Sequence, residues 1–258
     1  MILTAVILLS GGCKSDKTTY SNTSYKLMVK DVLGVSGTVT FTETSNNSTI
    51  IDIVLVNAPV GTHPANLYNS TAIEDGSIAK PLTPIDATGK SSTVVDIPYG
   101  TLIAYDGCIK VLKSSTELTV VLAQGDIGGN VITTTNKSYP LSTVGSFGVS
   151  GTALFEKRAN GNTLVTITLS GVIATDTYPA TINLGSIASV GGGPVVKTLS
   201  DVNGTTGKSY TNIHALDTGV VLTYDNWLVY DGYINIYQLA VLPANIISQG
   251  NIGSNLTN

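Results

Sequence analysis

Charged side chains are scarce in this chain: Asp, Glu, Lys and Arg make up 12% of its 258 residues, and the formal net charge is −4. The few Lys and Arg residues are also scattered along the sequence. Nucleic-acid binding requires a clustered basic surface, so the composition argues against such a partner. The hydrophobic fraction of 42% likewise excludes the low hydrophobicity of a disordered chain.

Histidine and cysteine are nearly absent, with only His63, His214, Cys13 and Cys108. Two histidines far apart in sequence do not assemble a Ser-His-Asp triad, and we expect both in loops. Cys108 has no histidine near it in sequence to activate a thiolate, and a lone thiol within a strand usually behaves as a small buried hydrophobe. We therefore expect no enzyme activity and no bound cofactor.

Long apolar runs are limited to residues 1–9, which are too few to span a bilayer as a helix. Their length suits the apolar region of a secretory signal. Small residues then precede Cys13, and this pattern resembles the lipobox of bacterial lipoproteins, in which the Cys is lipidated. The sequence departs from that pattern at Ser10, where Leu is usual, and in having no Lys or Arg before the run. An ordinary signal peptide, or a buried first strand with an incidental Cys, is the alternative.

Two phrases occur twice in the chain at the same offset of 125 residues, which predicts two copies of one domain. A Tyr-Asp-Gly phrase leads each pair, and a Gln-Gly phrase follows it. Smaller offsets between earlier matched segments place extra residues of the second copy in its loops, mainly around 214–219. The phrases are Tyr105–Val111 with Tyr230–Ile236, and Gln124–Asn130 with Gln249–Asn255.

Short strands are predicted by the alternation of Thr with Val, Ile and Phe, as in residues 35–41 and 49–56 around the turn Asn46-Asn47. No amphipathic helix longer than about two turns is evident, although a short helical turn is expected at 224–228. The pattern predicts an all-β protein with two tandem antiparallel β-sandwich domains. The expected boundaries are a signal peptide at 1–12, a lipidated tether at 13–27, a first repeat at 28–132, a linker at 133–140 and a second repeat at 141–258.

The order of these motifs resembles the CHRD (chordin-type) domain, in the tandem form found in lipoproteins of Bacteroidota. The segments that carry the resemblance are Gly-Thr-x-x-Phe at 37–41, His63-Pro64-Ala65, Thr-Gly-Lys-Ser at 88–91 and the two repeated phrases. The resemblance implies an immunoglobulin-like or superoxide-dismutase-like Greek-key β-sandwich, with no established enzymatic activity among the bacterial members.

The bacterial form of this family often carries a His-x-His pair after Pro-Ala and a further His after Tyr-Ile-Asn-Val, which together could hold copper or zinc. This chain has no histidine at any matching position, so we expect no metal site of that kind. The matching positions are Asn66, Tyr68 and Leu112 in the first copy, and Thr181, Asn183 and Tyr237 in the second.

Other polar motifs are explained more simply by turns. Gly-Lys-Ser closes a phosphate-binding loop, but Pro84 and Val202 stand where that motif requires its first Gly. Asp86 could suggest calcium, yet an Asx-type turn accounts for it with fewer assumptions. Asp106 and Asp231, each before a Gly, suit hydrogen bonds to the local backbone.

Tyr is frequent (12) relative to Phe (3) and Trp (1), which raises the question of a contact surface. Trp227 with Tyr224 and Tyr230 could form a platform for a sugar or a protein. The alternative is that this cluster packs beneath the short turn before the second Tyr-Asp-Gly phrase.

Together these features predict a non-enzymatic lipoprotein of the outer membrane, anchored through Cys13 and exposed at the cell surface or on the periplasmic face. The expected role is protein interaction, adhesion or assembly, with an unidentified protein or glycan partner. A carbohydrate- or small-ligand-binding accessory protein is the first alternative. A metal-binding protein of superoxide-dismutase type is the second.

Overall fold

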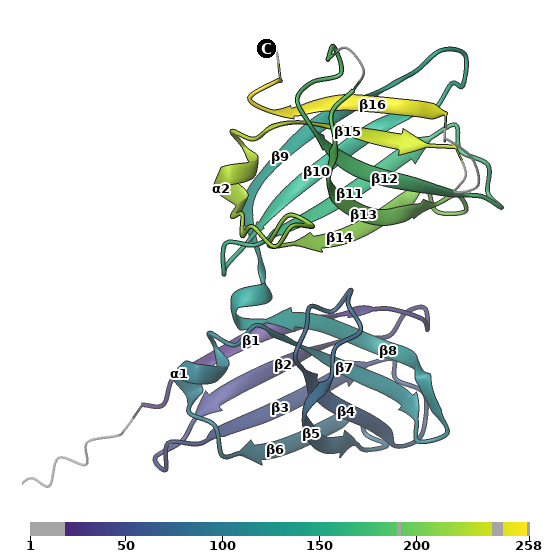
Figure 1. Cartoon of the computed structure of the whole chain (residues 1–258). Helices are drawn as coiled ribbons and strands as arrows, with labels where there is room; N and C mark the ends of the chain where they lie inside the picture. The colour runs from purple at the N-terminus through teal and green to yellow at the C-terminus, as the bar shows by residue number, and fades with distance from the viewer. Residues whose placement is uncertain (1–18, 190–191, 239–244, 257–258) are drawn as a thin grey trace, which may run out of the picture.

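The computed structural model describes residues 19–189, 192–238 and 245–256, and in these the chain is nearly all β (Figure 1). Sixteen strands form two eight-stranded antiparallel sheets, one after the other along the chain, and each curls around its own hydrophobic core. The signal peptide expected at 1–12 and Cys13 lie outside the described residues. The expectation of an all-β protein is confirmed.

The N-terminal barrel contains eight strands and one short helix. They are β1 (Asn22–Val29), β2 (Ser36–Glu43), β3 (Thr49–Val56), β4 (His63–Tyr68), β5 (Ile78–Ile85), β6 (Lys90–Val95), α1 (Tyr99–Leu102), β7 (Gly107–Ser114) and β8 (Glu117–Ile127). The 3-10 turn η1 (Gly128–Asn130) then leads to the second unit. The C-terminal barrel contains β9 (Ile132–Thr143), β10 (Ser150–Arg158), β11 (Thr163–Ser170), β12 (Thr177–Leu184), β13 (Val195–Asn203), β14 (Lys208–Ile213), α2 (Tyr224–Trp227), β15 (Asp231–Tyr237) and β16 (Ile246–Gly253).

Both barrels have the same strand order, because every strand of the first corresponds to the strand eight places later in the second. The N-terminal order is β5-β4-β7-β8-β1-β2-β3-β6. Its end strands β5 and β6 meet through a bond from Thr83 N to Thr93 Oγ1 (2.8 Å), whereas the second barrel closes through the pair Asn203–Lys208 between β13 and β14. The duplicated phrases therefore belong to a duplicated topology.

Two segments expected outside the repeats are strands. Residues 22–27 of the expected tether form most of β1 and pair with β2. Residues 133–140 of the expected linker lie within β9, and 136–140 of them pair with β10. Both segments are rich in Ser, Thr and Asn, so the sequence shows no clear alternation of apolar residues there. The few apolar residues that face the core include Leu27 and Tyr139. The covalent connection between the barrels is instead the short turn η1.

The hairpins expected at the start of each repeat are present. In β2 the side chains of Val39 and Phe41 are buried while their neighbours face outward, as a strand with one buried face requires. Asn47 (φ 56°) and Gly161 (φ 87°) take the left-handed conformation in the matched turns, which Asn and Gly tolerate best.

The repeated phrases are conserved between the two copies for a steric reason. A side chain on Gly125 would meet the carbonyl oxygen of Lys26 on the neighbouring strand β1. A side chain on Gly250 would meet the carbonyl oxygen of Pro140 in the same way. Gly128 has a positive φ of 55°, and a Cβ there would meet the carbonyl oxygen of Tyr105. The Tyr-Asp-Gly and Gln-Gly phrases thus contact each other at one end of each barrel.

The extra loop of the second repeat covers the outer edge of β13. Asp217 N donates to the carbonyl oxygen of Val196 (3.0 Å), and Thr198 N donates back to Asp217 Oδ2 (2.8 Å). The matching strand β5 has no such loop, but Pro81 and Pro84 remove two backbone donors from it. Both devices limit pairing of an edge strand with a foreign chain.

Candidate functional site at the junction of the barrels

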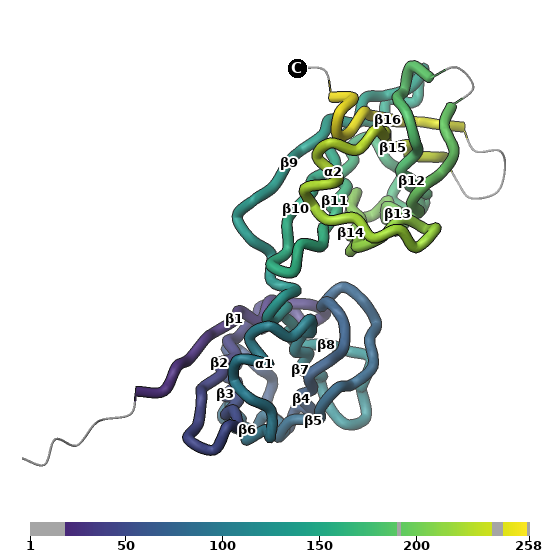
Figure 2. Tube along the Cα trace, turned by 60° about the vertical axis from the view of Figure 1, so that its left-hand side comes forward, coloured from purple at the N-terminus to yellow at the C-terminus, as the bar shows by residue number. Residues whose placement is uncertain are grey.

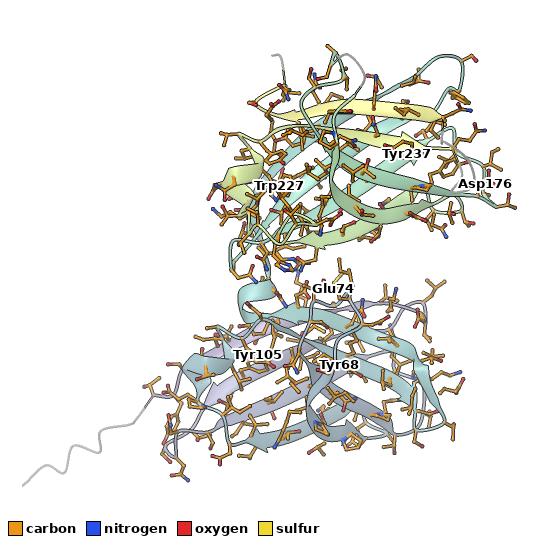
Figure 3. All side chains as sticks on the ribbon, viewed as in Figure 1. Tyr68, Glu74, Tyr105, Asp176, Trp227 and Tyr237 are labelled. Atoms are coloured by element: carbon orange, nitrogen blue, oxygen red, sulfur yellow. The ribbon has the colours of Figure 1, made fainter. Side chains whose placement is uncertain are left out.

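The expected aromatic cluster lies in the core of the C-terminal barrel. Trp227 is fully buried, Tyr224 is 1% exposed and Tyr230 is half-buried. The Trp227 ring is tilted by 51° against the Tyr230 ring, with centroids 4.9 Å apart, and it forms an edge-to-face pair with Phe155 at a centroid distance of 6.3 Å. Trp227 is the last residue of α2, where Figure 3 labels it. The arrangement is the packed alternative, and Trp227 and Tyr224 present no open platform to a sugar.

The helical turn expected at 224–228 holds this cluster. It is α2, and Thr223 caps it by accepting from Asn226 N while the Asn226 side chain accepts from Thr223 N. This reciprocal cap satisfies backbone donors that such a short helix cannot pair internally.

Cys108 and His63, two residue types that often take part in catalysis, are both buried in the fold. Cys108 is fully buried in β7, and this burial raises the pKa of its thiol to about 12. His63 was expected in a loop, but it begins β4 and is buried between the carbonyl oxygens of Lys113 (2.6 Å) and Pro59 (2.8 Å). His214 lies in an exposed bend, as expected.

The polar side chains at the positions that match the family's histidines form hydrogen bonds with one another in each barrel. In the second barrel Thr181 Oγ1 donates to Asn183 Oδ1 (2.7 Å) and lies 3.3 Å from Tyr237 Oη. In the first, Asn66 and Tyr68 are neighbours on one face of β4, and Lys110 lies over the Tyr68 ring. Among the described residues no group of three or more His, Cys, Asp or Glu side chains could hold a metal ion.

Both Thr-Gly-Lys-Ser segments are turns that lead into strands. Gly89 and Gly207 have positive φ angles, and β6 and β14 follow at once, where a phosphate-binding loop would lead into a helix. Asp86 accepts from Thr88 N (2.8 Å) and Thr88 Oγ1 (2.6 Å), which is the Asx-type turn expected there.

The structure brings together a different group, which includes Arg158, the only arginine in the sequence. Arg158 lies at the end of β10 and is fully buried. Its Nη1 donates to Asp126 Oδ2 of the first barrel (2.7 Å) and to the carbonyl oxygen of Asn130 in η1. Its Nε donates to Asn212 Oδ1 on β14 (2.8 Å). One guanidinium therefore links both barrels and the turn between them.

The hairpin that carries Arg158 makes further bonds to the first barrel. Asn160 Nδ2 donates to Asp106 Oδ1 (3.0 Å) and to Asn130 Oδ1 (3.2 Å), and Asn160 N donates to the carbonyl oxygen of Gly129 (2.8 Å). Asp106 and Asn130 belong to the two repeated phrases. The phrases of the first copy thus form a socket for the β10–β11 hairpin of the second.

The loop between β4 and β5 completes the junction. Ala72 N donates to Asp126 Oδ1 (2.6 Å), so both oxygens of this carboxylate are satisfied. Asn212 Nδ2 donates to Glu74 Oε2 across the junction (3.4 Å). Figure 3 shows Glu74 at the top of the N-terminal barrel, facing the other barrel. The junction is therefore a polar network that extends from the connecting turn η1 to the β4–β5 loop and to β14.

The matched positions at the outer ends of the two barrels do not preserve this ion pair. Thr44 stands where the second copy has Arg158, and Asn251 stands where the first copy has Asp126. The Asn251 side chain is used within its own barrel, where it accepts from Ile187 N (2.9 Å). Sequence reasoning missed this site, although a lone arginine with no counterpart in the other copy was a signal for it.

A hollow of about 450 Å³ adjoins the junction on the side of β1. Apolar side chains line most of it, including Met28, Val29, Val131 and Ile132, and Lys26 and Asp126 also border it. Asp126 is already paired with Arg158, so this carboxylate is not free to bind a ligand in the hollow.

No family model matches the chain, and neither a curated protein nor a solved structure is similar to it. Among the described residues no helix is both long and apolar enough to cross a membrane.

Proposed function

We propose that the chain is a non-enzymatic lipoprotein of the cell envelope, whose two β-domains act as one fixed module for protein interaction, adhesion or assembly. Lipid on Cys13 would anchor it in the outer membrane. The observation that carries the proposal is the junction, in which Arg158 and Asn160 hold the second barrel against the first. We infer that this network favours one defined arrangement of the barrels, because separating them would leave the Arg158–Asp126 pair broken.

The finer description of the fold belongs to the same proposal. We infer that each barrel is a Greek-key β-sandwich related to the CHRD domain. The common strand order of the two units and the structural use of both repeated phrases support this. The polar side chains at the family's histidine positions bond one another, so the metal-binding alternative gains no support from them.

The carbohydrate-binding alternative is not carried forward, because Trp227 and Tyr224 are buried. An aromatic side chain must expose its ring face to stack on a sugar, and exposing Trp227 would require opening the core around α2.

Anchoring is tested by the intact mass of the protein from native membranes, compared with a Cys13→Ala variant. We expect cleavage before Cys13 and the added mass of lipid, and loss of both in the variant. Protease treatment of intact cells then decides between the outward and the periplasmic face. A mass that retains residues 1–12, or one without lipid, would remove the anchor from the proposal.

The interaction role is tested separately, by cross-linking the full chain in its native envelope and identifying what it captures. The comparison is with Arg158→Thr, which keeps every exposed side chain of both barrels but breaks the junction. Partner capture that falls with this variant supports the fixed module. Hydrolytic or redox turnover by the purified protein would refute the non-enzymatic role.

A further inference from the structure

Two matched loops each expose a large apolar side chain. The β1–β2 loop contains Leu33-Gly34-Val35 and the β9–β10 loop contains Phe147-Gly148-Val149. In both, the Gly has a positive φ (84° and 71°) and the following Val is buried. This shared turn directs the preceding side chain outward, so that Leu33 is 92% exposed and Phe147 is 40% exposed.

The neighbouring loop at the same end of each barrel adds a second apolar side chain. Val60 in the β3–β4 loop is 95% exposed, and Ile173 in the β11–β12 loop is 60% exposed. Backbone groups of these loops are held, since Asn57 Nδ2 donates to the carbonyl oxygen of Gly34 (3.2 Å) and Ile173 N donates to Tyr178 Oη (2.7 Å). We refer to Leu33, Val60, Phe147 and Ile173 as the apolar tips.

All four apolar tips lie on one side of the molecule. In each barrel they occupy the end opposite the short helix, and Figures 1 and 2 show α1 and α2 on a common side. Asp176, at the end of the β11–β12 loop, marks the opposite side in Figure 3. The described chain also begins at the helix end. Asn22, the first residue of β1, pairs with Thr42, which lies next to the β2–β3 turn at that end. The junction at Arg158 fixes the two pairs of tips relative to each other.

Charge in these four loops is sparse and mixed in sign. The tips are uncharged, Lys30 and Asp31 in the first loop have opposite signs, Asp176 is the one charged residue of the β11–β12 loop, and the β9–β10 loop between residues 144 and 149 contains none. An attraction that depends on anionic headgroups would need clustered Lys or Arg, which these loops lack.

We propose that the apolar tips dock the molecule onto the surface of a neutral lipid bilayer. Each of the four loops contributes one tip, and Phe147 and Ile173 border a common small hollow. A protein partner would have to match the tips of both barrels at once, whereas the interfacial region of a bilayer accepts each side chain independently. The inference does not depend on Cys13, and it places this bilayer opposite the end where the described chain begins.

The test is co-sedimentation of the full chain with pure phosphatidylcholine vesicles. Every sample carries Cys13→Ala, so that lipid on that residue does not contribute to binding. We expect the combined replacement of Leu33, Val60, Phe147 and Ile173 by Ser to weaken vesicle binding by about tenfold or more, because each loses its buried apolar area. Adding phosphatidylglycerol is expected to change the binding little.

Matched controls are Val94→Ser and Val229→Ser, which remove exposed apolar side chains at the opposite end of each barrel and should leave binding unchanged. Emission of Trp227, the only tryptophan, reports whether the variants keep their fold. Binding that is absent, or that the tip replacements do not weaken, would overturn the proposal. Tip-dependent dimers in vesicle-free solution without vesicle binding would instead assign the tips to contact between two copies of the chain.

Discussion

Burial is the largest influence on the chemistry of Cys108. The thiolate is the reactive form of cysteine, and desolvation in β7 raises the pKa of this thiol to about 12, although the charge of Lys110 acts in the opposite direction. At neutral pH the native protein should therefore keep Cys108 in its inert thiol form, out of reach of reagents.

We expect Cys108 in a Cys13→Ala chain to resist maleimide labelling in the native state and to react fully in denaturant. The measurement is the mass added with time under each condition. Fast labelling of the folded chain at neutral pH would show that β7 opens readily, and it would contradict the burial of this residue.

At the residue scale, the sequence predicted those features that depend on residue type and near neighbours. The buried thiol and the Asx turn at Asp86 follow from residue type and local pattern. Arg158 could not be placed in this way, because its partners Asp126 and Asn212 are brought to it by the pairing of strands far apart in sequence. Its full burial depends on two barrels meeting, which no local pattern encodes.

Residue 125 is a glycine because β8 and β1 approach each other closely at this position. A Cβ at this position would meet the carbonyl oxygen of Lys26, which belongs to the backbone of β1 and cannot rotate away. We expect Gly125→Ala to lower the free energy of unfolding by about 1–3 kcal/mol, measured by denaturant titration.

Gly100 provides the matched control for that substitution. It lies in α1, where an added Cβ would have no atom within 4 Å beyond its chain neighbours and the backbone of its own helix, and its φ is not positive. Gly100→Ala should be neutral or stabilise the protein by up to about 1 kcal/mol, because Ala is the better helix former. Equal losses in both variants would show that crowding against β1 is not the reason for Gly125.

The loop that covers β13 should make the stability of the second barrel sensitive to acid. Partial burial raises the pKa of Asp217, but bonds from Lys197 and Thr198 outweigh it, so the net pKa is lowered. A carboxyl whose pKa is lowered by folding stabilises the protein above its unfolded pKa, and this contribution is lost as the pH falls through the folded pKa.

We therefore expect Asp217→Asn to destabilise the protein at neutral pH and to have less effect at pH values below the lowered pKa. Melting temperatures measured across the acid range check this, and light scattering would report whether the freed edge of β13 aggregates. Curves for wild type and Asp217→Asn that run parallel at all pH values would contradict it.

At the element scale, the sequence supports hairpins more clearly than it supports strand ends. The β2–β3 and β10–β11 hairpins combine alternating apolar residues with Asn and Gly turns, and both were predicted. Strands β1 and β9 were assigned to a tether and a linker, because outward Thr and Ser residues outnumber the buried ones, of which β9 has only Tyr139 and Leu141. Their strand state is set by pairing with β2 and β10, which is a tertiary effect.

On the scale of the whole molecule, the junction should make the two barrels unfold together. Removing one member of a buried ion pair leaves the other without its partner, which typically costs about 3 kcal/mol or more. We expect Arg158→Thr to lose about that much stability and to split one calorimetric transition into two. The neighbouring variant Lys157→Ala breaks an exposed pair with Asp225 and should cost about 1 kcal/mol or less.

A double variant tests whether the ion pair between Arg158 and Asp126 couples the two barrels. The outer ends of the two barrels carry Thr44 and Asn251 at the positions of Arg158 and Asp126, so the double variant Arg158→Thr with Asp126→Asn reproduces at the junction the residues of a free end. This variant no longer leaves a carboxylate without its partner, so it should recover part of the stability lost by Arg158→Thr. It should still unfold in two steps, because the link between the barrels is gone. Recovery of a single transition would show that packing around η1, and not the ion pair, couples the barrels.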